Sequence, residues 1–193
     1  MIVVNTGDDF DHLGLRICPD IDTVLYSLGG IANPETGWGQ ADETWNFMAA
    51  LERLGGESWF RLGDRDLATH VERTRRLQEG ENLSAITADF AGRLGIRHPI
   101  VPATDGSLPT IVRTHQGDLA FQEYFVRQQC APTVTGFDFA GAAQAEPSAA
   151  ISEAIESGKI EAVIICPSNP YVSIAPILAV PAISDFVSNA GVP

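Results

Sequence analysis

The run Ile2-Val3-Val4-Asn5-Thr6-Gly7-Asp8-Asp9 indicates the fold class of the chain. Its three β-branched residues are typical of a buried parallel strand, and its polar residues then form a loop at the carboxyl end of that strand. A second apolar run, Glu161 to Cys166, leads in the same way into the loop Pro167 to Asn169. Because ligands bind outside the carboxyl ends of the strands in open α/β sheets, both loops are expected on one rim. The sequence therefore predicts an α/β fold with its site at this rim, and a buried core thiol at Cys166.

A helix is predicted within the stretch Leu62-Gly63-Asp64-Arg65-Asp66-Leu67-Ala68-Thr69-His70. Apolar residues recur at helical spacing after the glycine, which predicts a helix with Asp64 as its N-cap, running to about Gly80. Asp66 and His70 are four residues apart and therefore share one face of this helix. Arginines flank the two acids, and the helix dipole attracts anions to the same end. A capped helix with solvated arginines is the simpler interpretation of this stretch taken alone.

The composition fits a single acidic domain. The chain has 193 residues, 45% of them hydrophobic, which is enough for one domain with a sizeable core. Its net charge is −13, from 25 acidic and 12 basic residues, and Lys159 is the only lysine. A basic patch of the kind that binds nucleic acid is therefore excluded. An acidic protein binds phosphates through local arginines, backbone amides or a divalent cation, so the charge balance favours metal-assisted chemistry.

Cysteine spacing and hydrophobicity favour a cytoplasmic protein. Cys18, Cys130 and Cys166 show no CxxC or CxxH spacing, which argues against a disulfide framework and against a zinc site. The longest apolar runs, Ile160 to Cys166 and Val172 to Ile183, are too short to span a bilayer. No basic segment precedes an apolar run at the amino terminus, so no signal peptide is predicted. We therefore expect a cytoplasmic protein that does not contact the membrane.

Glycine, proline and aspartate divide the rest of the chain into short elements. Further helices are expected to begin at Asp22, Asp42, Ser84 and Ser148. Further strands are expected at Ser58 to Phe60, His98 to Pro102, Thr110 to Thr114, Leu119 to Val126 and Thr133 to Phe139. A turn at Gln116 to Asp118 joins two of these strands into a β-hairpin.

Several residues have two open interpretations. Asp20 and Asp22 serve either as turn and cap residues, the commoner use, or as part of a site. Trp38 lies in a turn-rich loop and is either part of a packed lid or an aromatic platform for a flat ligand. The polar residues after the hairpin turn face either a ligand or solvent, and their spacing favours the solvated side of an edge strand: Gln122, Glu123 and Arg127.

Six sequence blocks together resemble the 2-phospho-L-lactate transferase family of coenzyme F420 biosynthesis, including its phosphoenolpyruvate-using bacterial members. The blocks, which cover nearly the whole chain, are VNTGDDF at Val4 to Phe10, RICPDIDT at Arg16 to Thr23, NPETGWG at Asn33 to Gly39, RLGDRDLATH at Arg61 to His70, FQEYFVR at Phe121 to Arg127, and PSNPYVSIAPILAVP at Pro167 to Pro181. Cys18 stands where many members have serine, which we interpret as tolerated variation.

The resemblance implies a Mg²⁺-dependent transferase. Such an enzyme moves a 2-phospholactyl or enolpyruvyl-phosphate group from a guanosine diphosphate conjugate to the terminal hydroxyl of the deazaflavin Fo. The products are (dehydro) coenzyme F420-0 and GMP. By analogy, Fo contacts Asp22 and Arg61, and the metal is held by Asp8 and Asp22. The residues expected to act in catalysis are Asp22, Asp64 and Asp66, and those expected to bind the nucleotide are Asn5, Thr6, Gly7, Ser168 and Asn169. Trp38 is expected to pack near the deazaflavin ring.

The resemblance also implies a Rossmann-like three-layer sandwich with a mainly parallel sheet and a β-hairpin insertion, in one domain spanning residues 1–193. Family members begin with a strand and a GGxGG-type loop before the block at Val4, and they continue well beyond the block that ends at Pro181. Both parts are expected to be missing here, so the domain is expected to be incomplete. A homodimer is expected from the resemblance alone.

Two other functions compete with the transferase. Members of the gluconeogenesis-factor family, non-enzymatic regulators that bind nucleotide sugars, are similar in fold and share an Asn-Pro loop after a late strand. The blocks GDRDLATH and FQEYFVR resemble the transferases more closely than these regulators. The second alternative is an inactive fragment that keeps the motifs without a complete site.

Overall fold

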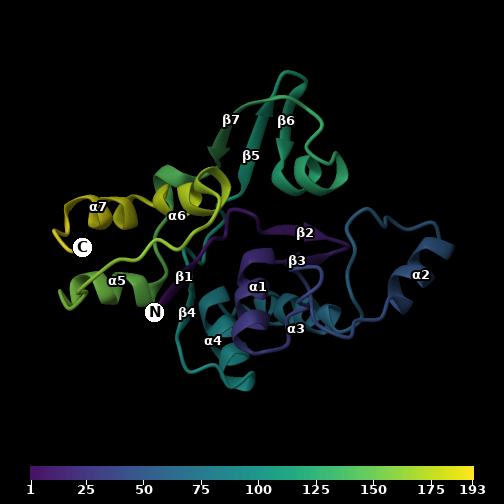
Figure 1. The fold of residues 1–193 in the computed structure, drawn as a ribbon, viewed down its shortest axis with the longest axis horizontal. Helices are drawn as coiled ribbons and strands as arrows, with labels where there is room; N and C mark the ends of the chain where they lie inside the picture. Colours follow the sequence, from purple (N-terminus) through teal and green to yellow (C-terminus); the bar gives the residue numbers. More distant parts are fainter.

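A pair of parallel strands forms the centre of the chain, in a computed structural model that describes residues 1–193 (Figure 1). β1 (Ile2–Val4) pairs with β4 (Ile100–Pro102). The other elements follow in chain order: β2 (Phe10–His12), β3 (Leu15–Ile17), α1 (Pro19–Leu28), α2 (Asn46–Arg53), α3 (Asp66–Gln78), α4 (Leu83–Arg93), β5 (Thr110–Thr114), β6 (Gly117–Ala120), the π-helix η1 (Glu123–Arg127), β7 (Val134–Phe139), the 3₁₀-helix η2 (Ala142–Gln144), α5 (Ala149–Glu156), the π-helix η3 (Pro170–Ile174), α6 (Ala175–Leu178) and α7 (Pro181–Asn189).

Helices cover both faces of the parallel pair. Successive strand residues point to opposite faces, so Ile100 packs against α1 and α4 while Val101 packs against α5 and α7. Figure 1 shows α5 and α7 on one side of β1 and β4, and α1 and α4 on the other. Burial of the two apolar clusters provides the main favourable energy of folding. The predicted α/β class with three layers is confirmed.

A separate antiparallel sheet has the order β6-β5-β7 and lies apart from the helices α1 and α4 (Figure 1). Its hairpin β5–β6 confirms the predicted insertion, and β7 pairs along the other edge of β5. A second hairpin, β2–β3, was not predicted from the sequence. Its two turn residues, Leu13 and Gly14, both have positive φ (52° and 75°), as a type I′ turn requires.

The second parallel strand, expected at residues 161–166, does not form. Ile164 is 83% exposed and Ile165 is 56% exposed, and Cys166, expected to be a buried thiol, is also exposed. A strand has no hydrogen bonds within itself, so a β-branched run becomes a strand only beside a partner. The parallel sheet contains only β1 and β4, and the backbone N–H of Val163 bonds instead to the oxygen of Pro193 at 2.9 Å.

Smaller differences concern element ends. The strand expected at residues 58–60 is a bend, and the one expected at residues 119–126 ends at Ala120 and is followed by η1. α1 begins at Pro19, a residue well suited to the first helical position, so Asp22 lies inside the helix and does not cap it. α2 begins at Asn46, and Asp42, expected as its cap, has a φ of 52° before the helix.

None of the helices by itself has the length and apolar character of a membrane span; the helices Pro170–Leu178 and Pro181–Asn189 reach them only as a pair, which is bent by 93°.

Candidate functional site

Two loops meet at one rim of the parallel pair through the buried side chain of Asn5. Its Nδ2 donates a hydrogen bond to the backbone oxygen of Val172 in η3, at 3.1 Å. Asn169 caps η3 because its Oδ1 accepts from the backbone N–H of Tyr171 at 2.9 Å. The loop after β1 and the loop before η3 therefore share one rim, as predicted, although residues 161–166 are not a strand.

The loop after β1 is tightly packed and contains an unpaired hydroxyl. A Cβ at Gly7 would lie 2.7 Å from Thr110 Oγ1 and 2.8 Å from Pro176 Cβ, so only glycine fits there. The side-chain hydroxyls of Thr6 and Thr110 are buried without a hydrogen-bond partner. Such groups are costly to bury unless a ligand or water pairs with them. Ser168, on the facing loop, is exposed.

Acidic side chains gather around Asn5. Its Nδ2 also donates to Asp20 Oδ2 at 2.7 Å and to Asp8 Oδ1 at 3.2 Å. Asp9 is buried next to them with both carboxylate oxygens lacking a hydrogen-bond partner, and Arg16 Nη2 lies 3.7 Å from one of these oxygens. The carboxylates of Asp8 and Asp20 thus share one amide donor, and no cationic side chain pairs with either.

The surroundings of these acids favour their protonated forms. Burial, followed by the charge of Asp20, raises the pKa of Asp8 to about 8. Burial also raises the pKa of Asp9 to about 7, although Arg16 opposes this effect. The pKa of Asp20 is raised as well, again by burial. Within this cluster, Asp8 and Asp20 are therefore the carboxyl groups without a cationic partner.

A buried ion pair lies between α1 and α3. Arg73, 1% exposed, donates from Nη1 to Asp22 Oδ2 at 3.1 Å and from Nη2 to Asp22 Oδ1. Burial lowers the pKa of Arg73, but the Asp22 carboxylate outweighs it and raises the pKa above its ordinary value. Asp22 is therefore already neutralised by a side chain of the protein.

His70 links this ion pair to a second carboxylate. Its Nδ1 lies 3.6 Å from Asp22 Oδ2, and its Nε2 lies 3.2 Å from Asp66 Oδ2. Tyr26 donates to Asp66 Oδ1 at 2.5 Å. Burial raises the pKa of Asp66, but the adjacent His70 imidazole and the hydrogen bond from Tyr26 outweigh it and hold the pKa below its usual value. The shared face predicted for Asp66 and His70 is confirmed.

Ligand atoms of Asp22, Asp66 and His70 all lie within 4.8 Å of one another, a spacing at which they could hold a metal ion. Both oxygens of Asp22 already contact Arg73. A cation at this position would have to compete with a buried guanidinium, so the group works better as a network of hydrogen bonds.

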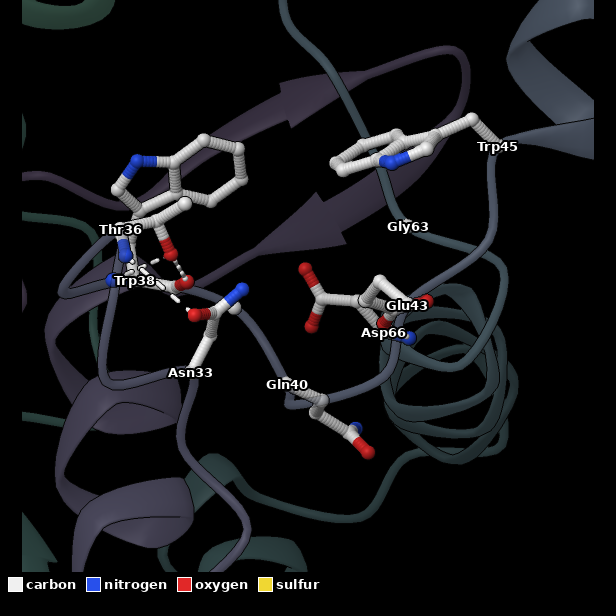
Figure 2. A pocket seen from close by; sticks show the side chains of 9 residues that line it. Asn33, Thr36, Trp38, Gln40, Glu43, Trp45, Gly63 and Asp66 are labelled. Atoms are coloured by element: carbon white, nitrogen blue, oxygen red, sulfur yellow. Dashed lines mark hydrogen bonds between the residues drawn. The ribbon is translucent and has the colours of Figure 1, made fainter.

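Asp66 also lines a pocket at the start of α3, shown in Figure 2. Trp38 and Trp45 lie along one side of this pocket in the figure, with Asn33, Gln40 and Glu43 beneath them. The two indole centroids are 6.3 Å apart with the rings inclined at 66°, and the Arg61 guanidinium lies 4.2 Å from the centroid of Trp45. The pocket therefore combines aromatic faces with polar groups, and Asp66 connects it to the buried network.

Asp64 was predicted to be the N-cap of its own helix, α3, and this prediction is wrong. The N-cap position of α3 is Arg65, which has no capping side chain. The Asp64 carboxylate instead accepts from the backbone N–H groups of Asn46 (3.0 Å) and Phe47 (2.9 Å) at the start of α2, and from the Thr44 hydroxyl. These bonds lower the pKa of Asp64 well below its usual range. Its role in the structure is to join two helices, and all its side-chain hydrogen bonds go to residues 44–47.

The family profile described as 2-phospho-L-lactate transferase CofD matches residues 1–193. The chain belongs to this family. Two curated relatives are named phosphoenolpyruvate transferase. The one from Streptomyces coelicolor is 44% identical over 100% of this chain and 61% of its own length, and the one from Mycobacterium tuberculosis is 45% identical over 99% and 59%. The chain thus spans about three fifths of the length of these relatives.

Among solved structures, the chain is similar to a crystal structure of a UPF0052 family member from Bacillus halodurans. The TM-score is 0.62 at 15% sequence identity, over 98% of this chain and 57% of the other. At this identity the likeness shows a shared fold. It does not choose between CofD chemistry and other functions on that fold.

Three side chains around the candidate site were not predicted from the sequence: Tyr26, Glu43 and Arg73. Gln122 had two interpretations, facing a ligand or solvent, and its spacing favoured solvent; it is instead 6% exposed, and its Nε2 donates to the backbone oxygen of Asp8 at 3.5 Å. Glu123 and Arg127, in contrast, pair with each other at 3.3 Å on the accessible side of η1. Arg73 follows His70 by three residues on one face of α3, which is the signal that could have placed it beside Asp22.

Proposed function

We propose that the chain contains the part of a phosphoenolpyruvate or phospholactate transferase active site that binds the acceptor and the part that binds the metal ion. The reaction moves the phosphorylated three-carbon group of a guanosine diphosphate conjugate to the terminal hydroxyl of Fo. A bond forms between the hydroxyl oxygen and phosphorus, the bond from that phosphorus to GMP breaks, and the hydroxyl proton is released. The observation that carries the proposal is the rim at Asn5, where the carboxylates of Asp8 and Asp20, neither paired with a cation, lie beside the loop before η3.

The acidic cluster fits Mg²⁺. Its donors are carboxylate oxygens, which this hard cation prefers. We assign Asp8 and Asp20 as the residues that would hold the ion, since they share one donor and lack a cation. Asp22, expected as the second ligand, is paired with Arg73 and becomes a support for His70. When bound, the ion supplies charge neutralisation for the diphosphate and acts as a Lewis acid.

The tryptophan side of the pocket of Figure 2 is assigned to Fo; the enclosed space is only about 10 Å³, so the flat ring would lie on the exposed indole surface at its mouth. Its indoles supply apolar faces for a flat ring, and Arg61, expected to contact Fo, is held on the face of Trp45. Asp66 faces this pocket and is fixed by Tyr26, so its carboxylate is suited to accept a hydrogen bond from a hydroxyl of the ligand. Asp64 is assigned a structural role in place of the catalytic role expected for it.

The guanosine nucleotide is assigned to the rim. Thr6 has a buried hydroxyl without a partner, and Ser168 is exposed on the facing loop. Asn5 and Asn169 organise the two loops through their own hydrogen bonds. Gly7 lets the backbone pass close to its neighbours. These residues position the phosphates with respect to the acidic cluster, which is the main requirement of phosphoryl transfer.

The direct test is to mix the purified chain with Fo, Mg²⁺ and each guanosine diphosphate donor in turn. We expect mass spectrometry to detect GMP and the condensed product with one of the donors. Omission of Mg²⁺ should abolish both signals. Absence of product with both donors would contradict the proposal, and stabilisation of the chain by a UDP-sugar but not by Fo or GDP would favour the regulator.

Replacing Trp38 by alanine should weaken Fo binding about tenfold, because one aromatic face of the pocket is lost. Fluorescence titration with Fo measures the dissociation constant. Trp59→Phe is the matched control, since Trp59 packs on His12 and Phe10 outside this pocket and its replacement should leave the affinity unchanged. An unchanged affinity of Trp38→Ala for Fo would contradict the assignment of this pocket to Fo.

A further inference from the structure

The loop that carries both tryptophans is joined to α3 by a second carboxylate, that of Glu43. Its Oε1 accepts from the backbone N–H of Asp66 at 2.7 Å, and its Oε2 accepts from that of Arg65 at 2.8 Å. Asp64 makes the opposite connection by capping α2. Each of the two helices is therefore capped by a carboxylate from the segment that precedes the other helix.

Gly63 allows this contact. A Cβ at position 63 would lie 2.2 Å from Glu43 Cδ and 2.5 Å from its Oε1. Any side chain there would displace the Glu43 carboxylate from the first turn of α3. The φ of Gly63 is not positive, so the requirement for glycine arises from the close approach of Glu43 and not from backbone strain.

The rest of this loop is held mainly by its own bonds. Asn33 Oδ1 accepts from the N–H of Glu35 at 2.9 Å, and the Thr36 hydroxyl donates to the oxygen of Trp38 at 2.6 Å. Trp38 itself is 48% exposed. Apart from Glu43, the loop reaches the start of α3 at its base. Arg65 Nη1 bonds to Ala41 O and lies 3.9 Å from Asp42 Oδ2, and Thr44 bonds to Asp64 through both its backbone oxygen and its hydroxyl. Glu43 is the side chain of this loop that bonds to Asp66 itself, and it thereby links the tryptophan side of the pocket to that residue.

We propose that Glu43 is a positioning residue for the flat ligand of this pocket. By bonding to the N–H of Asp66, it sets the separation between the tryptophan pair and the Asp66 carboxylate, so that ring and hydroxyl are bound together. This inference rests on the assignment of the pocket to Fo. Without Glu43 the loop also occupies other positions. The apparent affinity for the flat ligand then falls in proportion to the fraction of molecules whose loop keeps the binding geometry.

The test compares the full chain with its Glu43→Ala and Glu43→Gln variants, using Fo and GDP as separate probes. We expect Glu43→Ala to bind Fo about tenfold more weakly, the effect of a lost cap, with the affinity for GDP unchanged. Glu43→Gln retains one acceptor oxygen and should be intermediate. Hydrogen exchange of the amides in residues 33–45 should quicken in Glu43→Ala, with no change in α4. Glu35→Ala is the matched control, since Glu35 lies exposed in the same loop and its side chain makes no hydrogen bond or ion pair.

The outcomes separate this inference from the function on which it rests. If the unchanged chain binds Fo and Glu43→Ala binds it equally well, the positioning role is wrong and the pocket assignment stands. If the unchanged chain does not bind Fo, the pocket assignment fails and the positioning role fails with it. Equal loss of Fo and GDP affinity in Glu43→Ala would indicate general loss of structure and would also overturn the positioning role.

Discussion

Replacing Arg73 by methionine is expected to lower the free energy of unfolding by about 3–5 kcal/mol, which is the cost of leaving a buried carboxylate without its counterion. Arg73 is 1% exposed and both of its terminal nitrogens bond to Asp22. Methionine fills a similar space without charge, so the loss reports on the ion pair and not on a cavity. Urea denaturation followed by circular dichroism measures the change.

Two companion variants make this measurement specific. Arg75→Met removes an exposed arginine on the same helix, whose partners Glu72 and Glu79 are at the surface, and should cost less than about 1 kcal/mol. Adding Asp22→Asn to Arg73→Met removes the unpaired charge, so the double variant should recover much of the lost stability. A loss below about 1 kcal/mol in Arg73→Met alone would show that Asp22 does not depend on this pair.

The elements predicted well from the sequence are those with a local cause. Helix α4 was expected from Ser84 because apolar residues follow at helical spacing, and it begins one residue earlier, at Leu83, with Asn82 as its cap. β5 (Thr110–Thr114) matches its expected bounds because a short β-branched run precedes a turn. The Asp66–His70 pair follows from a spacing of four residues within α3.

The errors arose where a partner distant in sequence decides the structure. Residues 161–166 have strong β propensity, yet no neighbouring strand pairs with them. Asp64 has the local pattern of an N-cap, but the free N–H groups of α2 lie within reach and take its carboxylate. In both cases the local preference of the residues was recognised, but the structure they form depends on a pairing partner. That partner is set by the tertiary arrangement and could not be predicted.

In the candidate site, too, the errors concern partners that are distant in sequence. The sequence predicted acids at the rim and near α3, but it could not decide which acid has a cation as partner. Arg73 lies 51 residues from Asp22, and Asp20 is only two residues from Asp22, yet the two acids have opposite surroundings. On a helix, residues two apart point in different directions, so Asp20 faces Asn5 while Asp22 faces α3. This geometry changes the second metal ligand that we propose from Asp22 to Asp20.

Without divalent cations, the stability of the chain is expected to fall as the pH rises from about 6 to about 8. The pKa of Asp8 is about 8 and that of Asp9 about 7 in the folded chain, against 3.8 as the ordinary value. Between these values the folded chain binds more protons than the unfolded chain, so each carboxyl removes up to about 1.4 kcal/mol of stability per pH unit. Urea denaturation at several pH values measures the slope, which should be smaller in Asp8→Asn.

Mg²⁺ should reverse this loss, because the cation binds the ionised form of the cluster and must displace its protons. We therefore expect a larger increase in stability on adding Mg²⁺ at pH 8 than at pH 6, and almost none at either pH in Asp8→Asn. Asp11→Asn is the control: Asp11 is exposed nearby, and its replacement should leave both effects intact. A pH slope that Asp8→Asn does not change, or an equal effect of Mg²⁺ at both pH values, would show that the acids around Asn5 are not the metal site. The ion would then have to bind elsewhere, and the group formed by Asp22, Asp66 and His70 would become the next site to test.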